Sequence, residues 1–305
     1  MKKKWWIPVI SAIVLGVGFY VLFPARTVII ESIKSPVNEG AVIRILQQNR
    51  DWSTWLDTSY MDYQVRLRGS EVANYFFEFT QKQDTQFALL KVIPLSRDTS
   101  MLVWETRLPE VSISPAAIIK NRKRAKALQQ TMIAFLEKLE KLASDKRKVY
   151  GFAPFMEKVR DTAFLSTTIK LNTLPDQSII YKLVNKLEQY AKSQGVFTNR
   201  EPIFNVLEQP ANAQMKYLLM IAIPIEQVAP AMGDIVVKRM ITGNLLVADV
   251  EGTLPEIFKR FPVFQLYKED NGFISPAIPY IQIRKDHRLL PENEPWEMRF
   301  CYPVF

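Results

Sequence analysis

The sequence predicts an α+β protein with an N-terminal transmembrane helix and two further domains, and three observations lead to this prediction. An uncharged run opens the chain. A series of strand-like segments follows and ends in one long amphipathic helix. A Thr-Leu-Pro motif then occurs twice, at Thr173 and at Thr253. With 305 residues, the chain is long enough for two separate hydrophobic cores.

The composition is that of an ordinary globular protein, with 48% hydrophobic and 23% charged residues. The net charge of +9 is concentrated in short runs at Lys2–Lys4, Lys120–Lys126 and Lys146–Lys148. We interpret them as solvated charge or as attraction to an anionic membrane surface, because no nucleic-acid-reading motif accompanies them. Cys301 and His287 are the only residues of their types, which excludes an intramolecular disulfide and a metal site built from several such ligands. We therefore expect no metal, no cofactor and no nucleic-acid partner.

The opening uncharged run extends from Trp5 to Phe23 and would span about 28 Å as a helix, close to the hydrocarbon thickness of a bilayer. A cleavable signal peptide is the alternative, but its apolar part should end in small residues, whereas this run ends Val-Leu-Phe-Pro-Ala-Arg. The basic Lys2–Lys4 flank predicts a cytoplasmic N-terminus. Residues 1–25 are thus predicted to be a single-pass signal anchor in the cell (inner) membrane, with the bulk of the chain extracytoplasmic.

Residues 26–148 alternate between apolar and polar positions in several runs, which indicates an antiparallel sheet. After a first strand and a short helix, the strand-like runs are Asp62–Arg68, Val72–Thr80, Gln86–Leu95 and Ser100–Pro109. Ser114 and Pro115 have the form of a helix cap and first helical residue. The apolar residues from Ile118 to Leu142 recur at helical spacing, so a long helix is expected to pack on the sheet.

The segments IIESIKSPVNEGAVIRILQQNRDWSTW, VWETRL and FLEKLEKL resemble the START-like polyketide cyclase/dehydrase (SRPBCC) superfamily. The resemblance implies a helix-grip fold with a cavity between the sheet and the long helix. Five aromatic residues are candidates to line that pocket, or alternatively to form the core: Trp52, Trp55, Tyr75, Phe77 and Trp104. Glu78 and Glu105 are acids on these strands, but no base is paired with them in the sequence.

Residues 149–305 contain a duplicated unit of strand, helix, strand and strand, at about residues 155–227 and 235–305. Each Thr-Leu-Pro motif precedes a helical segment that ends near a glycine, at Gly195 in one copy and Gly272 in the other. In both copies a proline follows the glycine by seven positions, and strands come next. Pro262 is expected to bend or shorten the second helix.

This pattern, with its YPV ending, resembles the gyrase-inhibitor-like (GyrI-like) effector-binding domain, which also occurs at the C-terminus of some AraC- and MerR-type regulators. The resemblance implies that small, often lipophilic and cationic molecules bind in a groove between the two halves, and that some members hydrolyse reactive ligands. Cation binders usually carry an acid on a final strand. In this sequence Arg299 stands close to the position of that acid, and Glu297 stands two residues before it on the same strand face. Either Glu297 takes the place of the acid, or the ligand preference is for an anionic or neutral molecule. The candidate ligand-binding residues are Phe204, Tyr217, Tyr280, Trp296, Glu297 and Arg299. Core packing is the alternative for Phe204 and Tyr280, and a solvated ion pair at a strand edge is the alternative for Glu297 and Arg299.

The function that these patterns favour is a membrane-anchored small-molecule-binding protein with two ligand-binding modules. It would sense or sequester a lipophilic compound at the membrane surface. A hydrolase or cyclase acting on a lipophilic or reactive small molecule is the alternative, although the sequence contains no recognisable set of nucleophile, base and orienting residue. A role as a transcription regulator is not favoured, because no helix-turn-helix segment is found.

Overall fold

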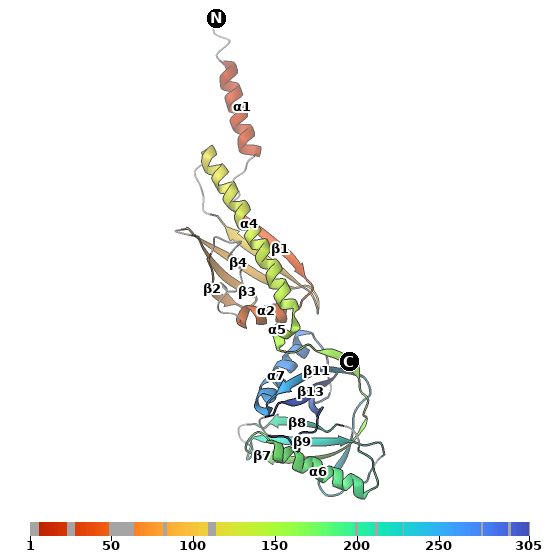
Figure 1. Cartoon of the computed structure of the whole chain (residues 1–305). Helices are drawn as coiled ribbons and strands as arrows, with labels where there is room; N and C mark the ends of the chain where they lie inside the picture. The colour runs from red at the N-terminus through yellow and green to blue at the C-terminus, as the bar shows by residue number, and fades with distance from the viewer. Residues whose placement is uncertain are drawn as a thin grey trace. The chain divides into compact units, whose positions relative to one another are not determined.

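The computed structural model describes residues 6–22, 28–48, 64–81, 84–108, 114–198, 201–210, 213–227, 229–275, 277–291 and 294–304. The chain divides into two compact units, Met1–Asp145 (unit 1) and Lys146–Phe305 (unit 2), and each is described by itself. Both units are mixed α+β structures, and each contains one antiparallel sheet (Figure 1).

The first helix, α1 (Trp6–Leu22), has 17 residues, all of them uncharged. In the described part of the chain, no helix is both long enough and apolar enough to cross a membrane. The predicted transmembrane anchor, and with it the single-pass inner-membrane localisation, is therefore wrong.

Unit 1 is built on a five-stranded antiparallel sheet with the strand order β1-β5-β4-β3-β2. Strand β5, the last of the five in the chain, pairs with β4 on one side and with β1 on the other, so β1 is an edge strand of the sheet. After α1, the elements of the unit are β1 (Val28–Ser35), α2 (Glu39–Gln48), β2 (Gln64–Glu71), β3 (Asn74–Gln81), β4 (Asp84–Pro94), β5 (Ser100–Arg107) and α4 (Pro115–Ser144). Ser114 caps α4, as predicted, by accepting a hydrogen bond from the Ala117 amide.

The core of unit 1 lies between one face of the sheet and α4, which runs along the strands for 30 residues (Figure 1). Aromatic rings dominate this core. Phe77 and Trp104 are stacked with their centroids 5.1 Å apart, and Phe135 of α4 meets Trp104 edge-on at 4.6 Å. All three side chains are fully buried. The helix is thus held to the sheet by the burial of apolar surface, to which Phe135 contributes together with aliphatic side chains such as Leu128 and Leu139.

We predict that Phe135→Ala destabilises the protein by about 3–5 kcal/mol, because it leaves a ring-sized cavity against Trp104. Ile133→Ala on the exposed side of the same helix is the matched control, and it should change the stability by less than about 0.5 kcal/mol. Urea unfolding of the full chain, followed by circular dichroism, measures both. Equal effects of the two substitutions would mean that α4 does not hold the sheet through this ring.

Unit 2 contains an eight-stranded sheet with the order β10-β7-β9-β8-β12-β13-β11-β6, and all of its pairings are antiparallel. Its elements are α5 (Lys146–Tyr150), β6 (Phe155–Lys158), β7 (Ala163–Leu171), α6 (Gln177–Ser193), β8 (Ile203–Glu208), β9 (Tyr217–Pro224), β10 (Val236–Arg239), β11 (Asn244–Gly252), α7 (Leu254–Asp270), β12 (Tyr280–Ile283) and β13 (Trp296–Val304).

The order strand, helix, strand, strand occurs twice in unit 2, as β7-α6-β8-β9 and as β11-α7-β12-β13. Both first strands have 9 residues and both helices have 17. The two sets meet where β8 pairs with β12. The short strand that precedes each set pairs with the first strand of the other set, β6 with β11 and β10 with β7. Each half therefore supplies an edge strand to the other half.

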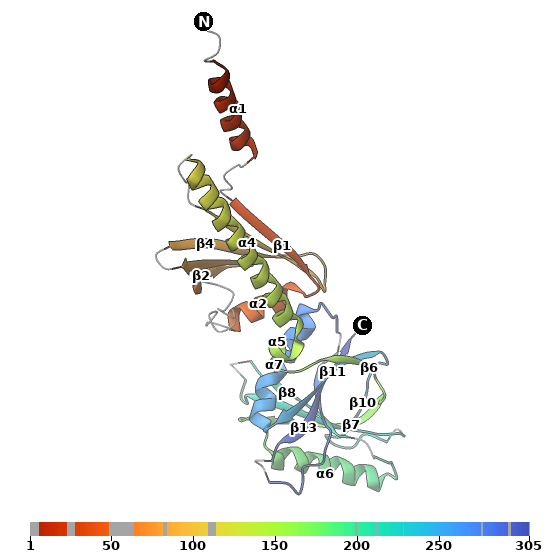
Figure 2. The ribbon, with the colours of Figure 1, turned by 45° about the horizontal axis from the view of Figure 1, so that its top comes forward.

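Helices α6 and α7 pack against the sheet of unit 2 (Figure 2). The N-terminal caps of the two helices occupy different positions relative to the Thr-Leu-Pro motifs. Asp176 accepts a hydrogen bond from the Ile179 amide at α6, whereas Thr253 itself caps α7 and its amide donates to Glu256. Helix α7 continues through Pro262, so the expected shortening does not occur.

Asp234, in the turn before β10, connects two elements of the first half. Its carboxylate accepts hydrogen bonds from Lys186 of α6 and from Thr167 of β7, all of them 2.6 Å long. These bonds, with Lys186 as the main cause, lower the pKa of Asp234 from 3.8 to about 2. The carboxylate is therefore favoured in the folded state, so these contacts stabilise the fold wherever Asp234 is ionised.

Because the folded-state pKa of Asp234 is depressed, its contribution to stability is complete above its ordinary pKa of 3.8 and is lost as the pH falls through about 2. We predict that Asp234→Asn lowers the urea midpoint at pH 7, and that the difference from the unmodified protein is smaller at pH 2 and vanishes below it. Glu226→Gln, an exposed carboxyl of the same unit, is the control and should have little effect. A difference that is the same at both pH values would contradict this role of the ion pair.

Candidate functional site

The two faces of the unit 2 sheet differ in what covers them. On β13, Trp296 stacks on Tyr181 of α6, and Phe300 contacts Phe261 and Phe264 of α7. Because side chains alternate along a strand, residues 296, 298 and 300 share the helix-covered face, and residues 297, 299 and 301 lie on the opposite face. Helices α6 and α7 thus pack on one face of the sheet, and no other described helix of unit 2 covers the opposite face.

A cleft of about 450 Å³ lies on that opposite face. Ile203 of β8, Gln282 of β12 and Arg299 of β13 follow one another across its floor, because they are partners in the strand register. Tyr280 lies beside them, two residues before Gln282. The chain segment 157–161 forms a wall, so strands of both halves and the connection between β6 and β7 contribute to the cleft.

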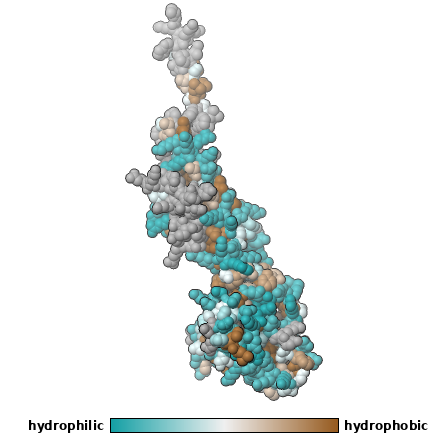
Figure 3. Space-filling view, viewed as in Figure 1, coloured by the Kyte–Doolittle hydropathy of each residue, from teal (hydrophilic) through white to brown (hydrophobic). Residues whose placement is uncertain are grey.

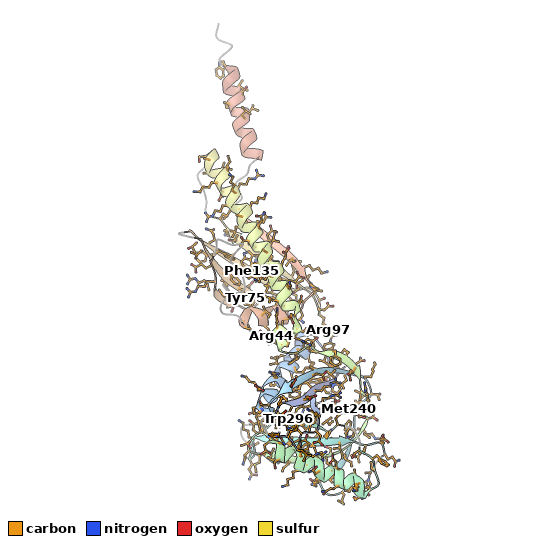
Figure 4. The ribbon with its side chains drawn as sticks, viewed as in Figure 1. Arg44, Tyr75, Arg97, Phe135, Met240 and Trp296 are labelled. Carbon is orange, nitrogen blue, oxygen red and sulfur yellow. The ribbon has the colours of Figure 1, made fainter. Side chains whose placement is uncertain are left out.

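Beneath the cleft lies an apolar cluster of Leu245, Val247, Tyr280 and Cys301, of which Leu245 and Tyr280 also line the cleft. Met240, labelled in Figure 4, packs against this cluster together with Val159 and Ile203. Burial raises the pKa of both the Tyr280 hydroxyl and the Cys301 thiol above their ordinary ranges. Both groups are therefore uncharged near pH 7, and Cys301 does not provide a thiolate nucleophile there.

Arg284 and Arg299 both border the cleft, and each of them is ion-paired. Arg299 donates from Nη1 to Glu157 at 3.0 Å and from Nε and Nη2 to Asp249 at 2.6 and 3.1 Å. Its side chain is only 12% exposed, and hydrogen bonding to Asp249 raises its pKa. Arg284 pairs with Glu201, at 3.2 Å. Arg299 is thus compensated by two carboxylates and joins β13 to β11 and β6.

Of the six candidate residues in unit 2, Tyr280 and Arg299 line the cleft. Trp296 does not: it is fully buried on the helix-covered face, where the His287 ring stacks on it at 4.3 Å (Figure 4). Phe204 is also buried on that face and meets Phe258 of α7 edge-on. A ligand therefore cannot stack on Trp296 as predicted, because the ring of Trp296 is not accessible.

The two remaining candidates lie on the surface away from the cleft. Tyr217 stands at the start of β9, opposite Glu208, with the ammonium group of Lys216 above its ring. Glu297 shares a face with Arg299 but pairs with Lys285 at 3.2 Å, and both side chains are more than half exposed. Neither residue lines the cleft.

The five candidates in unit 1 have a different placement. Trp52 and Trp55 lie outside the described residues. Tyr75, Phe77 and Trp104 are buried in the core between the sheet and α4, and Figure 4 labels Tyr75 near Phe135. A cavity of about 970 Å³ is bordered by β3, β4 and β5, and of these three residues only Phe77 borders it.

Several cleft residues were not among the sequence candidates, namely Glu157, Glu201, Ile203, Gln282 and Arg284. Gln282 could have been found from the sequence. It is the polar residue of the short strand Tyr-Ile-Gln-Ile, and because it lies two positions after Tyr280 it shares a face of the strand with Tyr280. Glu157 had none, because its position depends on the pairing of β6 with β11 across the chain. Among the described residues, no group of three or more His, Cys, Asp or Glu is arranged to hold a metal ion.

No family model matches the chain, and no curated protein matches it. Similar solved structures include the EcmrR C-terminal domain, with 13% identity, a TM-score of 0.42 and coverage of 50% of this chain and 98% of that one. A hydrolase from Listeria innocua has 12% identity, a TM-score of 0.37 and coverage of 50% and 91%. SAV2435 bound to tetraphenylphosphonium has 7% identity, a TM-score of 0.33 and coverage of 50% and 94%. These similarities are consistent with the GyrI-like prediction for unit 2.

We predict that Arg299→Met destabilises the protein by about 1–3 kcal/mol, because Glu157 and Asp249 lose a largely buried partner. Lys285→Met breaks the exposed pair with Glu297 and is the matched control, with an expected effect of at most about 1 kcal/mol. The measurement is again the urea midpoint of the full chain. Similar midpoints for the two variants would show that Arg299 is not a structural link between β13, β11 and β6.

Proposed function

We propose that unit 2 is a small-molecule-binding domain and that its ligand occupies the cleft over Ile203, Tyr280 and Gln282. The ligand is an amphipathic organic molecule, and the protein senses or sequesters it. The observation that carries this proposal is the cleft itself, whose lining is mainly polar and charged and also includes Ile203, Leu245 and Tyr280. A concave site with several convergent polar groups is a candidate place for a ligand.

The size and the chemistry of the cleft support a small ligand. A volume of about 450 Å³ is within the usual range for ligand pockets, roughly 300–1,000 Å³. The surface of unit 2 that Figure 3 displays is mostly hydrophilic, with small hydrophobic patches. Tyr280 supplies apolar ring surface to the ligand, and Gln282 supplies an amide that both donates and accepts hydrogen bonds.

For unit 1, the proposal is a START-like helix-grip domain that forms a second binding module. The element order β1-α2-β2-β3-β4-β5-α4 and the aromatic core under α4 support it. The cavity of about 970 Å³ beside β3, β4 and β5 is the candidate ligand space of this module, although no residue of α4 lines it and it is therefore not the cavity between sheet and helix that the resemblance implies.

We predict that Gln282→Trp blocks ligand binding to unit 2. Gln282 is half-buried on the cleft floor, so an indole there fills the space that a ligand would occupy. The probe is N-benzylacetamide, a neutral molecule with one aromatic ring and one amide, and saturation-transfer NMR on the full chain detects its binding. The unmodified protein should give a saturable signal that the variant lacks.

Gln214→Trp is the matched control, because Gln214 is exposed in the turn before β9 and does not line the cleft. It should bind the probe as the unmodified protein does. Circular dichroism shows whether each variant is folded. If Gln282→Trp is folded and binds the probe normally, the ligand site is not in this cleft.

A further inference from the structure

The charges that border the cleft have a definite order across the sheet. Glu201 precedes β8, Arg284 follows β12, Arg299 lies on β13 and Glu157 lies on β6. In the strand order β8-β12-β13-β11-β6, the two arginines are therefore central and the two carboxylates are on the outside. Gln282 lies between the arginines, because it is the register partner of Arg299 and stands two residues before Arg284.

The hydrogen bonds leave specific donors and acceptors available in the centre. Arg299 uses Nε, Nη1 and Nη2 for its two carboxylates. Arg284 uses Nη1 for Glu201, and among the described residues its Nε and Nη2 have no further partner. The Gln282 side chain has no protein partner there either, and Glu157 accepts from Arg299 through Oε1 alone. The cleft thus offers N–H donors beside Gln282 and a carboxylate oxygen at its rim.

The charges around the cleft also balance. Lys158, Arg160, Arg284 and Arg299 are cationic, and Glu157, Asp161, Glu201 and the Arg299 partner Asp249 are anionic. A ligand with one net charge would add an uncompensated charge to this neutral set, or would separate an existing ion pair to gain a partner. A ligand with one charge of each sign adds no net charge and can bind both kinds of group.

From these observations we propose that the cleft selects a zwitterionic ligand. The ligand's anionic group is bound by Arg284 and Gln282, its cationic group by Glu157, and its apolar part lies on Ile203 and Tyr280. This inference rests on the proposed ligand site and adds the charge class of the ligand. It also replaces the sequence-based assignment of charge selection to Glu297 and Arg299, because Glu297 lies outside the cleft and Arg299 is compensated.

The test compares probes that share an aromatic ring and differ in charge. The zwitterion is 3-(benzyldimethylammonio)propanesulfonate, the cation is benzyltrimethylammonium, the anion is benzenesulfonate and the neutral reference is N-benzylacetamide. Saturation-transfer NMR titrations on the full chain give the four dissociation constants. The zwitterion should bind at least about tenfold more tightly than each of the other probes.

Two variants assign the charges. Arg284→Gln should remove the preference for the zwitterion over the cation, and Glu157→Gln should remove the preference over the anion. Lys285→Gln and Glu297→Gln are the matched controls, since they make the same charge changes in an exposed pair outside the cleft. Both controls should keep the full preference for the zwitterion.

Each outcome bears on a different claim. If the cation or the anion binds as tightly as the zwitterion, or if Arg284→Gln weakens all four probes by the same factor, the inference is wrong and the ligand site stands. If none of the four probes binds to the unmodified protein, the proposed function fails together with the inference. If the controls lose the preference as well, charge selection does not reside in the cleft.

Discussion

Strand β13 directs Trp296 and Phe300 towards helices α6 and α7, and it directs Arg299 and Cys301 to the other side of the sheet. The arrangement of unit 2 depends on this alternation. The helix-covered face is closed by buried aromatic rings, which contribute most of the apolar area in such a core. On the opposite face, where none of the described helices of unit 2 packs, the cleft combines charged side chains such as Arg284 and Arg299 with the buried Tyr280. The same strand thereby stabilises the fold on one side and borders the candidate site on the other.

The exchange of edge strands explains why both halves are needed for the cleft. Strand β6 precedes the first set of elements in the chain but pairs with β11 of the second set. This pairing brings Glu157 within 3.0 Å of Arg299, from which it is separated by 142 residues in sequence. The floor then continues through β13 and β12 to Ile203 of β8, in the first half. A single half would have neither the complete floor nor the paired carboxylates.

The local features were accessible from the sequence, and the long-range ones were not. The caps at Ser114 and Thr253 and the left-handed glycines Gly195 and Gly272, with φ of 67° and 60°, all follow from short-range chemistry. The face of Trp296 depends on which strand pairs with β13 and in what register, and a strand pattern alone does not specify that. Because of this, the strand pattern predicts Trp296 and Tyr280 in one groove, whereas the structure places them on opposite faces.

The membrane prediction rested on hydropathy alone. The uncharged run from Trp5 to Phe23 located a helix correctly, since α1 comprises Trp6–Leu22. The described part of the chain nevertheless contains no helix that is both long and apolar enough to cross a membrane.

The central claim is that the ligand of unit 2 lies on the face opposite α6 and α7. A crystal structure of the full chain soaked with 3-(benzyldimethylammonio)propanesulfonate tests it most directly. The account predicts density for the probe over Gln282, with its sulfonate near Arg284 and its ammonium near Glu157. Density for the probe on the helix-covered face, beside Trp296, would contradict the account.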